Sequence, residues 1–199
     1  MQSLEVKTLL VDTSRITLRR ITPEEFELLC QDNPNLRLEL TATGELVTMP
    51  PVGLGSSEKN GDLTADIIIW NRSTGLGRVF DSSGGFTLPS GAVRSADVMW
   101  IENSKAATIS FEITFPTLIP DFVIELRSKS DSLKTLQDKM VEYRDNGVQL
   151  GWLINPQKKQ VEIYRLGQEK EVLESPTTLS GEDVLPGFVL ELSAIYKSR

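Results

Sequence analysis

The stretch PDFVIELR, residues 120–127, decides how this chain folds, because its side chains alternate with the period of a β-strand. One face carries Phe122, Ile124 and Leu126. The opposite face carries Asp121, Val123, Glu125 and Arg127. The second face is too charged for a core, so the strand places polar groups inside an otherwise buried element.

A helix and a second strand follow directly. Residues 128–131 are typical of a turn, and Ser132 can cap a helix that runs to Asn146 and stops at Gly147. Residues 150–155 contain the continuous apolar run of a second buried strand. Strand, helix and strand within about 35 residues predict a right-handed crossover between neighbouring strands of a sheet.

The composition favours a single domain over residues 1–199, since 199 residues with 39% hydrophobic content can bury a full core. No run approaches the roughly 18 apolar residues of a membrane span, and residues 1–20 lack the order of a signal peptide. Cys30 is the single cysteine, which agrees with a reducing compartment. We therefore expect a soluble, cytoplasmic protein without membrane contact.

The absence of histidine restricts the chemistry most strongly. It excludes Ser-His-Asp and Cys-His nucleophilic sites and nearly all zinc sites, so any hydrolysis relies on carboxylates, lysine, tyrosine and a hard metal. The net charge of -7 argues against a broad phosphate-binding surface but leaves a local basic patch open.

The N-terminal part predicts a helix and a hairpin. Residues 16–20 form a weak strand pattern, and Thr22-Pro23-Glu24-Glu25 combines a cap, a first-turn proline and a capping box for a helix over 23–32. Strands over 36–40 and 45–49 flank a turn at Thr43-Gly44. A further amphipathic helix is expected over 57–71.

The middle and the tail predict more strands. Strand-length pieces cover 78–80, 86–88 and 92–101, and Asp97 lies inside the third. Residues 102–119 indicate a loop with a short element, and 161–165 another strand. The expected fold is α/β or α+β, a mixed β-sheet flanked by helices, with an N-terminal helix and β-hairpin.

Asp97 and Glu125 form the candidate metal site. Each sits on a predicted strand between residues that belong in a core, and Arg127 follows Glu125 on the same face. Two carboxylates converging from adjacent strands can hold Mg²⁺, which prefers oxygen ligands. An aspartate followed by E-x-[K/R] is typical of a metal-dependent phosphodiesterase.

Several motifs resemble the bacterial “putative restriction endonuclease” family of the PD-(D/E)XK nuclease superfamily. They are residues 37–40 (RLEL), 44–46 (GEL), 95–97 (SAD), 120–128 (PDFVIELRS), Lys139 with Tyr143, 151–156 (GWLINP), 161–164 (VEIY) and 184–188 (VLPGF). The resemblance covers nearly the whole chain. It implies a restriction-endonuclease-like fold in which Asp97, Glu125 and the carbonyl of Leu126 hold the metal.

The resemblance also identifies a departure. The superfamily's lysine falls at position 127, where this chain has arginine, which is always protonated and cannot act as a general base. Lys139 lies at the border of the apolar stripe of its predicted helix, so it can reach the sheet, whereas Lys134 faces water. We expect Lys139 to replace the motif lysine, with Arg127 as the competing candidate. Glu39 is a possible third acid of the family pattern or part of a solvated hairpin face.

The resemblance implies a magnesium-dependent DNA endonuclease, with Mn²⁺ as a substitute metal and a homodimer as the working form. The alternative is an inactive protein of the same fold that binds nucleic acid or a protein partner. In this alternative Asp97 and Glu125 bind no metal and instead form structural ion pairs with Arg127 or Arg94. Tyr143 is expected in the core, and Asp121 is expected to cap or pair at the start of its strand.

Overall fold

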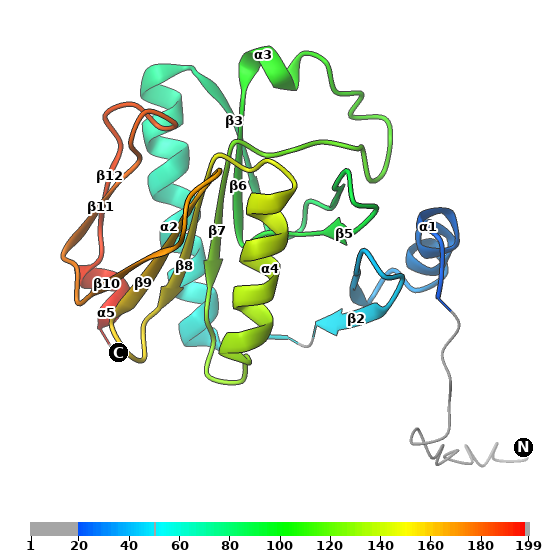
Figure 1. The fold of residues 1–199 in the computed structure, drawn as a ribbon, viewed down its shortest axis with the longest axis horizontal. Helices are drawn as coiled ribbons and strands as arrows, with labels where there is room; N and C mark the ends of the chain where they lie inside the picture. The colour runs from blue at the N-terminus through cyan, green and yellow to red at the C-terminus, as the bar shows by residue number, and fades with distance from the viewer. Residues whose placement is uncertain (1–19, 50, 198–199) are drawn as a thin grey trace, which may run out of the picture.

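A six-stranded mixed sheet forms the centre of the computed structural model, which describes residues 20–49 and 51–197 (Figure 1). Its strands, in spatial order, are β10 (Glu171–Glu174), β9 (Gln160–Arg165), β8 (Leu150–Asn155), β7 (Phe122–Leu126), β6 (Val98–Glu102) and β3 (Gly77–Asp81). β7 and β8 are parallel, and the other neighbours are antiparallel. Helix α4 (Leu133–Asp145) joins β7 to β8, which is the crossover that residues 120–155 predict.

Helices cover both faces of this sheet. Helix α2 (Leu54–Thr74) packs on one face and α4 on the other (Figure 1). Phe122, Ile124 and Leu126 face the α2 side, while Val123 faces the α4 side. All five residues of β7 are buried. The expectation that the second face of β7 is too charged for a core is therefore wrong, because Glu125 finds partners in Lys139 and Tyr143 on α4.

The N-terminal part forms the predicted helix and hairpin. Helix α1 (Pro23–Asp32) begins with the capping box of Thr22 and Glu25. Strands β1 (Arg37–Leu40) and β2 (Leu46–Met49) pair antiparallel across Gly44, whose φ of +78° favours glycine. The weak strand pattern over 16–20 falls almost wholly on residues outside the described part of the chain.

The strand predicted over 92–101 is two strands in two sheets. β5 (Val93–Arg94) joins the four-stranded sheet β2-β1-β5-β4, in which β4 is Phe86–Thr87, whereas β6 belongs to the central sheet. Residues 95–97 connect them, so Asp97 precedes β6 and does not lie inside a strand. The chain changes sheets here because Val93 packs into the α1 core while Met99 packs under α4.

The remaining elements complete the α2 side. Helix α2 begins three residues before the predicted start and ends at Gly75, which adopts φ +66°. The loop over 102–119 contains the short helix α3 (Asn103–Ala106). β11 (Thr178–Ser180), β12 (Val189–Glu191) and α5 (Ser193–Tyr196) place Leu190 and Ile195 in the core on this side. Among the described residues, no helix is both long and apolar enough to cross a membrane.

Candidate active site

The candidate site lies on the face of β7 that α4 covers. Glu125 on β7 is buried, with 4% of its surface exposed. The register pairs Val98 with Ile124, so Asp97, which comes directly before β6, lies at the end of β7 where Glu125 stands. The Asp97 carboxylate also accepts the backbone N–H of Leu126 at 2.7 Å, which ties it to the end of β7.

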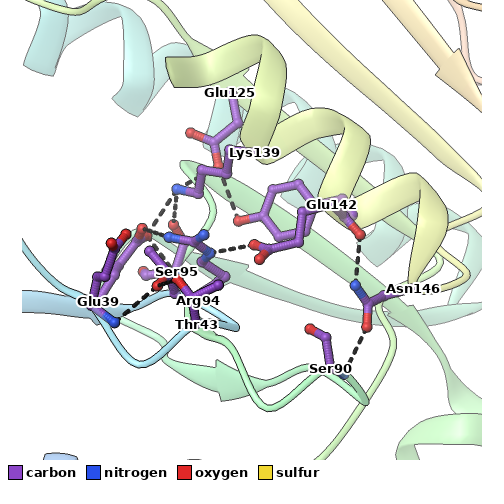
Figure 2. A network of polar contacts seen from close by, with 12 residues as sticks. Glu39, Thr43, Ser90, Arg94, Ser95, Glu125, Lys139, Glu142 and Asn146 are labelled. Carbon is purple, nitrogen blue, oxygen red and sulfur yellow. Dashed lines mark hydrogen bonds and ion pairs between the residues drawn. The ribbon is translucent and has the colours of Figure 1, made fainter. Parts of the chain in front are cut away.

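Lys139 reaches this face from α4 and is nearly buried, with 9% exposed (Figure 2). Its Nζ lies 2.9 Å from Oε1 of Glu125 and 2.8 Å from Oε1 of Glu39. It also donates to the backbone carbonyl of Ser95 at 2.9 Å. Three oxygens from three separate segments therefore surround one ammonium group.

Glu39 enters from β1 and is 2% exposed, so the alternative of a solvated hairpin face is wrong. The Arg94 guanidinium donates to Oε2 of Glu39 at 3.1 Å, and the Ser95 N–H donates to Oε1 at 3.0 Å. Arg94 also pairs with Glu142 on α4, as Figure 2 shows. This network binds the N-terminal sheet to the crossover helix.

Two more residues, Tyr143 and Asn60, contact the site, although the sequence analysis assigned neither to it. The hydroxyl of Tyr143 donates to Oε1 of Glu125 at 3.1 Å, although its ring is core as expected. Asn60 on α2 donates to Oδ1 of Asp97 at 3.4 Å. Tyr143 lies one helical turn after Lys139, so the i,i+4 spacing could have identified it.

Arg127 lies apart from this cluster. Its guanidinium donates to the carbonyl of Asp131 at 3.2 and 3.3 Å and to the side-chain oxygens of Asn155 and Gln157, each at 3.4 Å. Arg94 bonds Glu39 and Glu142. Within the described residues, neither arginine forms an ion pair with Asp97 or Glu125. The reading of those two acids as structural partners of an arginine is therefore not what the geometry shows.

Asp121 pairs at the start of its strand, as expected. Its carboxylate accepts the Glu102 N–H at 2.8 Å and forms an ion pair with Lys105. Both contacts lie at the opposite end of β7 from Leu126.

Burial and neighbouring charges give the acids different proton affinities. Burial raises the pKa of Glu125 to about 8, against the opposing effect of Lys139 and with a contribution from Asp97. Burial also raises the pKa of Asp97. For Glu39 burial acts in the same direction, but Lys139 and Arg94 outweigh it and hold the pKa below its ordinary value.

Lys139 retains its proton. Burial disfavours its charge, yet Glu125 and Glu39 outweigh this effect and keep the pKa of Lys139 well above its ordinary value. Near neutral pH the cluster thus contains an ammonium, an ionised Glu39 and a Glu125 that carries a proton much of the time. Glu125 is the group that a cation would have to deprotonate.

The donors present fit a magnesium ion. Among the described residues, no group of three or more histidine, cysteine, aspartate or glutamate side chains is arranged to hold a metal. Mg²⁺ does not require one, since it commonly takes one or two carboxylates and keeps several waters. Asp97, Glu125 and the Leu126 carbonyl supply hard oxygens. A bound cation would favour the ionised form of Glu125, whose pKa burial raises.

The mixed sheet and the crossover helix that joins β7 to β8 define a restriction-endonuclease-like fold. A crystal structure described as a putative nuclease belonging to DUF820, from Anabaena variabilis ATCC 29413, has the same fold with a TM-score of 0.77. It is 21% identical, and the match covers 88% of this chain and 97% of that one. Residues 23–193 match the family Uma2, described as “Putative restriction endonuclease”, and the chain belongs to this family. A search of curated proteins finds no match.

Proposed function

We propose that this protein is a magnesium-dependent endonuclease that hydrolyses phosphodiester bonds in DNA. The contact of Lys139 with Glu125, beside the Asp97 carboxylate that is tied to Leu126, is the observation that supports it most. Family membership supports the nuclease class.

Each residue has a defined task in this proposal. Asp97, Glu125 and the Leu126 carbonyl hold the cation. When bound, Mg²⁺ supplies Lewis-acid polarisation of the phosphate and lowers the pKa of the attacking water. Lys139 remains protonated, so it places the phosphate and offsets the negative charge that grows on its oxygens. Glu39 and the Ser95 carbonyl hold the ammonium in place.

The reaction adds water across one P–O ester bond. The water oxygen bonds to phosphorus, the ester bond breaks, and the leaving oxygen gains a proton. Because Lys139 is charged before the reaction begins, it does not take the proton from water. Its contribution is electrostatic, and its loss should lower kcat more than metal affinity.

Cleavage of supercoiled plasmid tests the proposal. Wild type with Mg²⁺ or Mn²⁺ should nick and linearise the plasmid, while Glu125→Gln, which preserves shape but not charge, should not. Metal should also raise the melting temperature of wild type, and Asp97→Asn should lose that gain. A protein that neither cuts DNA nor responds to either metal would contradict the proposal.

One observation favours an inactive nuclease-fold protein as a second candidate. Arginine replaces the motif lysine at position 127, and its guanidinium bonds Asp131, Asn155 and Gln157 without reaching the two acids. The metal titration decides between the two. The proposal further includes a homodimer and a cytoplasmic location; light scattering at working concentration tests the first, and fractionation of cells tests the second.

A further inference from the structure

A cleft of about 370 Å³ opens beside the candidate site and is lined by basic side chains. Its walls are the start of α2, the connection from β7 to α4, the turn after β8 and the residue that follows α5. Leu126, whose carbonyl belongs to the proposed metal site, lines the same cleft. The cleft and the candidate site therefore meet at the carboxyl end of β7.

The charge of the cleft is opposite to that of the protein. Four basic residues line it, namely Lys59, Arg127, Lys129 and Lys197, against the single acid Glu58 among the described lining residues. The whole chain carries -7. Such local concentration of cations in an acidic protein attracts an anion to one place and leaves the remaining surface repulsive to it.

Arg127 gives the cleft a fixed cation. The four hydrogen bonds that its guanidinium donates to described residues all go to neutral oxygens, namely the Asp131 carbonyl and the side-chain amides of Asn155 and Gln157. The Asp131 carboxylate instead accepts the Ser128 N–H at 2.7 Å. Within the described part of the chain Arg127 has no carboxylate partner, so its position is held while its charge stays uncompensated.

Three lysines add positive charges around the Arg127 guanidinium. Lys129 and Lys197 are exposed and Lys59 is partly exposed. None of the three forms an ion pair with a described carboxylate, whereas Lys134 on the outer side of α4 pairs with Asp138. Uncompensated lysines around a held arginine are the arrangement that binds a phosphate.

We infer that this cleft binds a backbone phosphate of the DNA substrate next to the one that is cleaved. Arg127 is then a substrate-positioning residue and not a substitute for the catalytic lysine. The inference rests on the proposed function and deepens it, because it states where the strand runs: from Asp97 past Leu126, between the start of α2 and the β7–α4 connection.

DNA binding by the cleavage-deficient Glu125→Gln protein, measured without metal, tests this inference. Fluorescence anisotropy of a labelled duplex at several salt concentrations gives both affinity and salt slope. Lys129→Gln and Arg127→Gln should each weaken binding roughly tenfold and lower the salt slope by about 0.9, the value for one phosphate contact. Two duplexes of unrelated sequence should lose affinity equally, since phosphate contacts carry no sequence information.

Lys134→Gln is the matched control, because it removes the same charge from a side chain that is 77% exposed and away from the cleft. It should leave affinity and slope unchanged. Because Arg127 also donates to the Asp131 carbonyl, its loss could disturb the loop as well as remove a charge. Lys129→Gln loses no hydrogen bond found in the structure, so its effect on DNA affinity reports the charge alone. Melting curves of each variant confirm that the fold is intact.

The outcomes for the cleft and for the enzyme are separable. The inference that the cleft binds phosphate would be overturned if Lys129→Gln and Arg127→Gln left DNA affinity and salt slope unchanged, even if wild type cuts plasmid. An equally large loss of affinity in Lys134→Gln would overturn it as well. A selective loss in the cleft variants would support the cleft even if no condition gives cleavage. Wild type that binds no duplex at low salt would overturn it as well.

Discussion

Replacing Glu125 by glutamine should change how the stability of the metal-free protein depends on pH. Burial raises the pKa of Glu125 from 4.5 to about 8, so the native state binds a proton that the unfolded state has released between these values. The stabilisation from this proton is complete below pH 4.5 and is lost as pH rises through 8. Glutamine does not titrate and should abolish the loss.

The magnitude follows from the width of the pH interval. A difference of one bound proton between the native and unfolded states changes the free energy of unfolding by roughly 1.4 kcal/mol per pH unit. Wild type should therefore lose about 2 kcal/mol of stability between pH 6 and pH 7.5. For a chain of this size that corresponds to roughly 4 to 8 °C in melting temperature. Glu39 has a lowered pKa and Lys139 a raised one, so neither contributes within this interval.

Urea unfolding followed by circular dichroism at pH 6.0, 6.75 and 7.5, in buffer with a chelator, measures the effect. Glu169→Gln, at an exposed position before β10, is the control and should retain the wild-type slope. Equal slopes for wild type and Glu125→Gln would refute the reasoning, because they would mean that Glu125 is already ionised at pH 6.

Three further outcomes are expected. Lys139→Ala should cost about 3 to 5 kcal/mol of stability by urea unfolding, because it leaves Glu125 buried without a cation and Glu39 with Arg94 alone, while Lys134→Ala on the same helix should cost under 1 kcal/mol. Gly151→Ala should cost about 1 kcal/mol, since its new Cβ would lie 2.5 Å from Cε of Met140, which is the end of a flexible but buried side chain that must turn away, whereas Gly61→Ala has open space in a helix and should stabilise by about 0.5 to 1 kcal/mol. Thr22→Ala should cost about 1 kcal/mol in the same unfolding assay by removing the cap of α1, and no loss would show that the capping box contributes nothing.

Sequence patterns were sufficient where the structure is local. The crossover from β7 through α4 to β8 follows from alternation, a Ser132 cap and the Gly147 stop, all within one segment. The proximity of Asp97 to the end of β7 was also accessible, because Glu125 lies within one predicted strand and Asp97 lies beside another. Whether these residues perform the roles expected of them stays a prediction that the cleavage and metal experiments test.

Contacts between distant segments could not be read from the pattern. Glu39 looks solvated in its hairpin because its partners, Arg94 and Lys139, lie 55 and 100 residues later. The division of 92–101 into two strands likewise depends on which sheet each half pairs with. The burial of β7 on both faces was missed for the same reason, since a buried glutamate is acceptable only with an ammonium beside it.

The long separation between Glu39 and Lys139 has a consequence for folding order. The crossover consists of neighbouring segments and is able to form early, whereas closing a loop of 100 residues to dock the hairpin is slow. A chain that has formed its crossover without docking the hairpin contains Asp97 and Glu125 but lacks the carboxylate that holds the ammonium. The cluster around Lys139 is therefore complete only when the fold is complete, and on the proposed function a partly folded chain should leave DNA uncut.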